Sequence, residues 1–306
     1  MNARRHGLAA RATARMLSAL CLLTALTALA GSAGSAWAQG TWVEVERYET
    51  LVGSRSADDV KRDALYGALA EAVRRVAGVR VQGTEFSSRT DSAGRVVDHY
   101  AEAVRLDAAG RATGWTVVKE EWSAAKPGTK GAAVVYHLIV RVRVEREAGT
   151  ADAGFTVRVQ PNSDRLRVRG AELKGNDELV ARITVTKRAT LTVVIIVDDS
   201  VFVLAPSAYV EAPEVAPGAT VEVPDAASRE AGIRFRAALP AGVTSRSELL
   251  AVVATLRPVP LWSGAGNGQA RDTGVLTLGE FNKWLVGIPL DQRAVAQVSI
   301  EVQKVP

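Results

Sequence analysis

The clearest periodic pattern of apolar residues in the chain is helical and covers residues 56–77. Ser56 and Asp59 form a potential capping box at the first turn, and Gly78 follows the last turn. Apolar residues recur every three or four positions: Val60, Ala64, Leu65, Ala68, Leu69, Ala72, Val73 and Val76. The pattern predicts an amphipathic helix whose apolar face packs against a sheet.

Three later segments have the period of β-strands: residues 100–106, residues 115–122 and Val134–Arg146. In the third segment, apolar residues occupy the even positions from Tyr136 to Val144, whereas the odd positions are mostly polar and include His137. This alternation predicts a strand with one face in water and His137 on that wet face. Turns are expected at residues 108–114 and 126–128. We therefore predict an α+β module in which a long helix packs on an antiparallel sheet.

Residues 147–154 are small or acidic, which predicts a linker. Beyond it, short apolar runs separated by Gly, Pro and Asp favour a mainly-β, sandwich-like domain. These runs are residues 155–159, 166–170, 178–185, 189–197, 200–205, 220–224, 233–239 and 248–256. Thr277 and Glu280 form a second potential capping box, which predicts a short helix before a final strand at residues 296–302. The predicted organisation is a signal peptide at 1–38, the α+β module at 39–147, the linker at 148–154 and the mainly-β domain at 155–306.

The first 38 residues have the pattern of a signal peptide, in which arginines precede an apolar run at residues 16–30 and small residues follow it. Ala36 and Ala38 fit a cleavage site of the A-x-A type, so cleavage is predicted before Gln39. The apolar run is shorter than the roughly 20 residues that span a bilayer, so we expect the mature protein to be released into the periplasm or the medium. No Phe-Leu pair follows the two N-terminal arginines, which favours ordinary secretion over twin-arginine export.

Removal of this leader changes the charge of the chain. The sequence has 38 Lys and Arg against 33 Asp and Glu, and the leader holds four of these bases and none of the acids, which leaves a formal charge of +1. Both signs are interspersed beyond the leader, whereas a nucleic-acid-binding domain carries a sustained basic patch, so no nucleic-acid partner is expected. The single cysteine, Cys21, lies in the leader, so we expect neither a disulfide nor a thiolate metal ligand in the mature chain.

Two carboxylates, Asp198 and Asp199, follow the apolar run VVIIV at residues 193–197. A nucleotide hydrolase holds magnesium with acids at the end of such a strand, but it also needs a G-x-x-x-x-G-K-[ST] loop, and the chain contains no Gly-Lys pair. A second apolar run follows at residues 201–205, and Asp and Ser between two strands favour a turn. We therefore predict a hairpin turn rather than a metal site.

No catalytic, metal-binding or cofactor-binding residue is predicted elsewhere. His99 and His137 are isolated in the sequence, which excludes a zinc site built from imidazoles and thiolates. Glu120 and Glu121, beside Trp122, are the best local candidates for sugar hydrolysis, but adjacent strand residues point to opposite faces and would not meet across one bond. The tryptophans outside the leader are scattered, which favours packing over a ligand platform: Trp42, Trp115, Trp122, Trp262 and Trp284.

Part of the second domain has a recognisable order of features. Residues 191–204 read as strand, turn and strand, Pro206 lies in the following loop, residues 216–224 end in Pro, and residues 239–242 read Leu-Pro-Ala-Gly before a strand. Over residues 155–261 this order resembles an uncharacterised bacterial domain-of-unknown-function family whose members often sit behind Ser/Thr kinase or caspase-like peptidase domains. The resemblance carries no catalytic residue, and the chain has neither a kinase catalytic loop nor a caspase-like cysteine.

The first module shares two shorter features with another group of proteins. Its helix ends in Val-Ala-Gly-Val at residues 76–79, and a Gly-Trp-Thr-Val strand follows at residues 114–117. In these features it resembles the N-terminal module of flagellar-assembly T-type and LPP-type envelope proteins. This resemblance assigns no pathway.

These patterns together predict a non-catalytic, exported cell-envelope protein that binds a partner or ligand and holds no cofactor. The expected partner is an envelope protein or a cell-wall component, and no transmembrane span is expected after cleavage. The alternative is a periplasmic hydrolase whose carboxylate pair is assembled by the fold. Two carboxylates that converge in a pocket with perturbed pKa values would favour this alternative.

Overall fold

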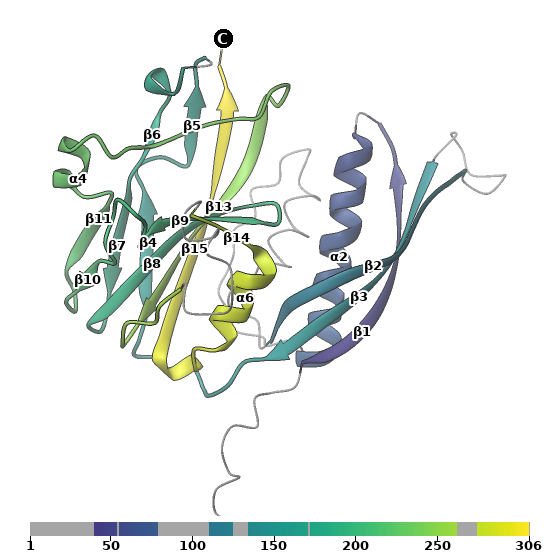
Figure 1. Cartoon of the computed structure of the whole chain (residues 1–306), viewed down its shortest axis with the longest axis horizontal. Coiled ribbons are helices and arrows are strands. Elements are labelled where there is room, and N and C mark those ends of the chain that lie inside the picture. The colour runs from purple at the N-terminus through teal and green to yellow at the C-terminus, as the bar shows by residue number, and fades with distance from the viewer. Residues whose placement is uncertain are drawn as a thin grey trace, which may run out of the picture. The chain divides into compact units, whose positions relative to one another are not determined.

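The computed structural model describes residues 40–53, 55–78, 110–124, 134–170, 172–261 and 274–305, and Gly40–Pro306 forms one compact unit (Figure 1). The predicted signal peptide, with Ala36, Ala38 and Gln39, lies outside the described residues, as do the predicted strand at 100–106 and the turn at 126–128. In the described part of the chain, no helix combines the length and the apolar character that a membrane span requires.

The first sheet is antiparallel, with the strand order β1 (Thr41–Leu51), β3 (Val134–Arg146), β2 (Gly110–Ala124). The alternation predicted for β3 is confirmed, because the even positions from Tyr136 to Val144 are buried on one face. Strand β1 was not predicted, although Val43 and Val45 alternate with polar residues in the same way. Val45 is fully buried opposite Val140 of β3, so β1 extends the apolar face of the sheet.

Helix α2 (Ala57–Ala77) packs against the apolar face of this sheet. Its predicted caps are confirmed, since the hydroxyl of Ser56 accepts a hydrogen bond from the Asp59 N–H at 3.1 Å and the Gly78 N–H donates to the Arg74 carbonyl at 3.0 Å. Residues outside the predicted apolar stripe, among them Asp63 and Tyr66, are also buried. The helix is therefore covered on more than the one face that its sequence pattern indicated.

The turn predicted at residues 108–114 is wrong for its described part, because Gly110 to Gly114 belong to β2. Both glycines have another role in the strand. A Cβ atom at Gly110 would lie 2.7 Å from the Cβ of Ala77, so glycine permits the end of α2 to approach the strand. Gly114 follows a shift in the register between β2 and β3, where the strand bulges.

Most of the remaining strands form a seven-stranded sheet with the order β14 (Val275–Thr277), β9 (Ser200–Ala205), β8 (Ala189–Val197), β13 (Ser245–Thr255), β15 (Arg293–Lys304), β5 (Arg165–Val168), to which β10 (Glu214–Val215) adds beside β8. A three-stranded sheet has the order β11 (Thr220–Val223), β7 (Ala181–Val185), β4 (Val157–Pro161), and β12 (Phe235–Arg236) pairs with β6 (Glu178–Leu179). Short helical elements are η1 (Leu173–Gly175), α4 (Ala226–Glu230) and η2 (Leu290–Gln292). The abundance of strands beside few helices confirms the α+β, mainly-β class in its general form.

The strand predicted at residues 233–239 is shorter than expected, since only Phe235 and Arg236 form β12. The residues on either side of β12 make other backbone hydrogen bonds. The Ile233 N–H donates to the Ser228 carbonyl in α4 at 2.9 Å, and the Ala237 N–H donates to the Asp177 carbonyl at 2.9 Å. The Ala237 bond continues the register of β12 and β6 by one residue, whereas the Ile233 bond joins the chain before β12 to α4.

The large sheet has a hydrophobic core on each face. One core joins Leu191 of β8 to Ile183 of β7, between the large sheet and the three-stranded sheet β11-β7-β4. The other joins Val194 of β8 to Leu138 of β3 and to Phe281 of the helix α6 (Leu278–Val286). Apart from Thr190 and Thr192, strand β8 is apolar, because both of its faces are buried. The predicted division into two separate domains stays a prediction.

Helix α6 begins with the predicted capping box. The Thr277 hydroxyl accepts from the Glu280 N–H at 3.2 Å, and the Glu280 carboxylate accepts from the Thr277 N–H at 2.8 Å. The helix lies on β2, where the Asn282 side chain donates to the Ala112 carbonyl at 2.9 Å. A Cβ atom at Gly279 would lie 3.2 Å from the Thr113 carbonyl oxygen, so this glycine keeps the helix close to the strand.

The first residues of the predicted linker are anchored in the structure. The Glu147 carboxylate is buried between the guanidinium groups of Arg111 and Arg293. Its neighbour Ala148 accepts a backbone hydrogen bond from the Leu290 N–H at 2.9 Å. The buried network connects the start of β2, the end of β3 and the start of β15.

Candidate functional site

The face of the first sheet that points away from α2, called the outer face below, carries a compact group of polar side chains. The strand register places Tyr48, His137 and Glu121 in one row across β1, β3 and β2. Glu46 and Lys119 lie in the next row. These five residues are called the histidine cluster.

His137 lies at the centre of this cluster. Its Nε2 atom lies 2.8 Å from a Glu46 carboxylate oxygen, and its Nδ1 atom lies 3.1 Å from a Glu121 carboxylate oxygen. The Tyr48 ring stacks on the imidazole with 4.4 Å between centroids and 2° between planes. His137 is therefore only 7% exposed, and the prediction of a solvated histidine is wrong because neighbouring strands cover it.

Each carboxylate of the cluster has further donors. The Tyr48 hydroxyl donates to Glu46 at 2.7 Å, and this bond, followed by the contact with His137, lowers the pKa of Glu46. The Lys119 ammonium donates to Glu121 at 2.8 Å, and this bond, followed by the contact with His137, lowers the pKa of Glu121. Both groups therefore act as ionised acceptors. The bond to Glu46 also raises the pKa of Tyr48, which keeps its hydroxyl protonated.

The two adjacent acids Glu120 and Glu121 point to opposite faces of β2, as their sequence positions predicted. Glu121 contacts His137 on the outer face, whereas Glu120 accepts from the Tyr136 hydroxyl at 2.6 Å on the inner face. The bond from Tyr136 lowers the pKa of Glu120. These two acids do not form a pair. The acid that joins Glu121 at His137 is Glu46, which lies on the strand that was not predicted.

The described tryptophans have two kinds of environment. Trp115, Trp122 and Trp284 are partly buried and pack against the core, in agreement with the packing role predicted for them. Trp42 differs, because it is 49% exposed on β1, and the Arg141 guanidinium lies 5.6 Å from the centroid of its ring. Trp262 lies outside the described residues.

Asp198 and Asp199 form the two-residue turn between β8 and β9, so the predicted hairpin is confirmed. Asp198 adopts a φ of 51°, in the left-handed region that Asn and Asp tolerate better than most residues. Its carboxylate lies 3.0 Å from the Arg62 guanidinium of α2, and the Asp199 carbonyl accepts from the Leu278 N–H of α6 at 2.7 Å. The turn thus contacts two helices.

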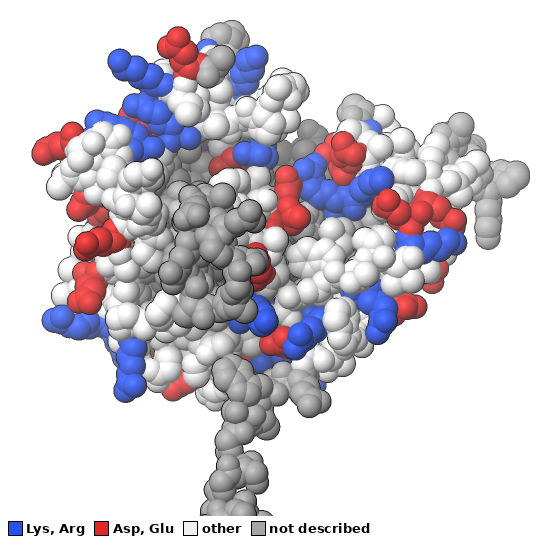
Figure 2. All heavy atoms as spheres, viewed as in Figure 1, with Lys and Arg blue, Asp and Glu red and all other residues white. Residues whose placement is uncertain are grey.

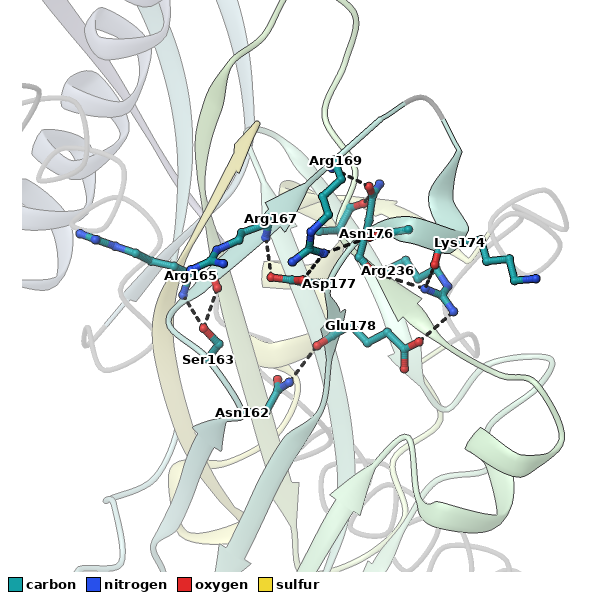
Figure 3. Close-up of polar contacts among 12 residues, drawn as sticks. Asn162, Ser163, Arg165, Arg167, Arg169, Lys174, Asn176, Asp177, Glu178 and Arg236 are labelled. Atoms are coloured by element: carbon teal, nitrogen blue, oxygen red, sulfur yellow. Dashed lines mark hydrogen bonds and ion pairs between the residues drawn. The ribbon is translucent and has the colours of Figure 1, made fainter. Parts of the chain in front are cut away.

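A larger polar group surrounds β5, the edge strand of the seven-stranded sheet, and its role is structural. The Asp177 carboxylate accepts from the Arg167 backbone N–H at 3.0 Å, and the Asn176 side-chain oxygen accepts from the Arg169 N–H at 2.9 Å (Figure 3). The Asp177 N–H donates in turn to the Arg167 carbonyl at 2.9 Å. These bonds occupy the outward backbone groups of β5 and close this edge of the sheet.

Charges elsewhere are mixed. On the face shown in Figure 2, acidic and basic side chains alternate over the described residues without a continuous patch of one sign. Within the part of the chain that the structure describes, no three His, Cys, Asp or Glu side chains are grouped as a metal site would require. The histidine cluster combines an exposed tyrosine ring with charged side chains that are held by hydrogen bonds.

No known family model matches the chain, and no curated protein matches it.

Proposed function

We propose that the protein is a non-catalytic, exported protein of the cell envelope that binds a partner through the outer face of the first sheet. The partner is an envelope protein, and the contact is centred on Tyr48. Export rests on the predicted leader and cleavage before Gln39.

One observation carries this proposal: the Tyr48 ring is 61% exposed and yet held in place by His137 and Glu46. Binding usually costs conformational entropy when side chains are ordered, and a ring that is already ordered avoids that cost. Tyr, Trp and Arg are enriched among the residues that dominate binding energy. Trp42 and Arg141 add these types to the same face.

The hydrolase alternative has less support. Glu46 and Glu121 do converge on one histidine, but bonds from Tyr48 and Lys119 lower the pKa of each carboxyl group. A glycosidase needs one carboxylic acid with a raised pKa as its proton donor. The two acids therefore fit charge recognition better than proton transfer.

We also propose boundaries for the domains of the chain. We assign residues 39–147 to an α+β module, residues 148–154 to a linker and residues 155–306 to a sandwich-like domain. The resemblance of residues 155–261 to the domain-of-unknown-function family supports a non-catalytic role, because it transfers no catalytic residue.

Site-specific crosslinking tests the proposal. A photoreactive amino acid replaces Tyr48 in one version of the protein and Tyr209 in another, and both are expressed in cells that make the protein. Tyr209 is a matched control, because it is an exposed tyrosine on the loop after β9 (79% exposed). We expect a discrete crosslinked species in the envelope fraction from position 48 only. Equal patterns from both positions, or none from position 48, contradict the proposal.

A further inference from the structure

The free edge of β1 differs from the other strand edges of the described residues. Strand β2 has two shifts of register, β5 is closed by Asn176 and Asp177, and β14, β11 and β4 are five residues or shorter. Strand β1 instead pairs with β3 over eleven consecutive residues without a shift. Among the described residues, β1 has no bulge and no covering loop and is not short, so its protection against strand addition consists of its charged side chains.

The backbone groups at this edge can be assigned. Each residue of an antiparallel strand points its N–H and C=O to the same side, and the side alternates along the strand. The Glu44 carbonyl accepts from the Arg75 guanidinium at 3.1 Å, which indicates that the even-numbered residues of β1 point away from β3. The close stacking of Tyr48 on His137 agrees, because side chains approach most closely in non-hydrogen-bonded pairs. Glu46, Tyr48 and Thr50 therefore present backbone groups at the edge.

We propose that β1 accepts an extended, basic segment of a partner protein as a fourth strand of the first sheet. This inference rests on the proposed function and specifies its partner. Strand addition supplies affinity through main-chain hydrogen bonds and specificity through alternate side chains. The edge strand holds three acids and one base, Glu44, Glu46, Glu49 and Arg47, so its charge is complementary to a basic strand.

The charges also select against a second copy of the chain. Pairing β1 with its own copy brings two acidic strands together, and like charges on facing residues are destabilising. Arg47 does not relieve this, because it lies between Glu49 at 3.6 Å and Glu71 at 3.4 Å within the chain. The Glu44 carboxylate has no ion pair with any described residue. Arg141 lies opposite Glu44 on β3 and its guanidinium is placed over the Trp42 ring, so a Lys or Arg of an incoming strand can pair with the Glu44 carboxylate from the other side.

The same register describes the segment that fits. Basic residues at alternate positions face Glu44 and Glu46 on the outer face, and small apolar residues between them continue the inner row of Val43 and Val45. The residue opposite Tyr48 lies beside its exposed ring and extends the row that Glu121, His137 and Tyr48 form.

Hydrogen exchange of the purified protein tests this directly with a synthetic peptide of alternating Lys and Val. In the free protein, the amides of Glu46, Tyr48 and Thr50 are expected to exchange fast. The peptide is expected to slow them, and a version with Glu in place of Lys is expected to bind at least about tenfold more weakly, because two facing charge pairs change sign. A version with N-methylated amides on its pairing side is expected not to bind.

A pair of variants separates strand addition from surface adsorption. Thr50→Pro removes an outward N–H without removing a bond to β3, whereas Thr50→Val keeps the N–H and the shape of the side chain. Peptide affinity is expected to fall in the first variant and to stay unchanged in the second. The inference fails if the edge amides are already protected in the free protein, or if the peptides with Lys and Glu bind alike. Crosslinking at position 48 without these effects leaves the proposed function standing and removes the inference.

Discussion

At the scale of residues, the main feature beyond the histidine cluster is the buried ionic network at Glu147. Its side chain is 1% exposed, and those of its partners Arg111 and Arg293 are 2% and 1% exposed. Burial lowers the pKa of Arg293 to about 10, although the charge of Glu147 opposes this shift. The Arg293 guanidinium also donates to the Ile288 carbonyl at 2.7 Å. The Glu147 carboxylate therefore contacts two buried guanidinium groups.

Replacement of the Glu147 carboxylate is expected to destabilise the protein. Glu147→Gln takes the carboxylate partner from the buried Arg293 guanidinium, and we expect the free energy of unfolding to fall by about 3–5 kcal/mol. Glu301→Gln is the matched control, because Glu301 pairs with Arg165 on the surface at 3.1 Å, where the loss is expected to be within about 1 kcal/mol. Urea denaturation of both variants measures the difference. Equal small losses would show that the network contributes little.

Single residues were harder to predict than their strands. Alternation along β3 identified the face on which His137 lies, but the cover comes from Tyr48 and Glu46 on a strand far away in sequence. Glu147 stands in a run of small residues that is typical of a linker, and its partner Arg293 is 146 positions away. Burial of a polar residue depends on such distant partners, which local patterns do not contain.

At the scale of elements, the turn between β8 and β9 can be tested against the remaining metal hypothesis. Replacing Asp198 and Asp199 together by Asn and Gly supplies a favoured two-residue hairpin turn and removes the partly buried ion pair with Arg62. We expect the thermal midpoint to change by less than about 4 °C. We also expect no rise in the midpoint of the parent protein with magnesium or calcium. A metal-dependent rise that the variant abolishes would support a metal site at this turn. A ligand that binds only the native state, at a hundredfold excess over Kd, adds about 2.7 kcal/mol to the free energy of unfolding.

Elements with strong patterns were predicted well. Strands β3, β8 and β9 begin and end where alternation or apolar runs meet turn residues. The start of β2 was mistaken for a turn because glycine marks both turns and close packing, and only the position of Ala77 distinguishes the two. Strand β1 was not predicted because it contains the charged residues Glu46, Arg47 and Glu49, which weaken the alternation of apolar and polar positions.

At the scale of the whole molecule, the predicted leader defines the N-terminus that we expect of the mature protein. We expect mass spectrometry of the exported protein to give a chain that starts at Gln39, since Ala36 and Ala38 are the small residues that signal peptidase requires. Ala38→Phe is expected to block processing, whereas Cys21→Ser is expected to leave it unchanged. An intact Met1 or an acylated Cys21 would contradict this prediction.

The position of β15 in the large sheet has a consequence for the timing of folding. This strand, Arg293–Lys304, lies between β13 and β5, and it pairs in parallel with β5, so that Glu301 lies beside Arg165. The large sheet is therefore incomplete until β15 has been synthesised, and pairing between such distant segments is slow compared with the formation of local structure. The seven-stranded sheet thus cannot be completed from the segments that precede β15 alone. For the secretion route that the leader predicts, we expect this sheet to be completed only after β15 has crossed the membrane.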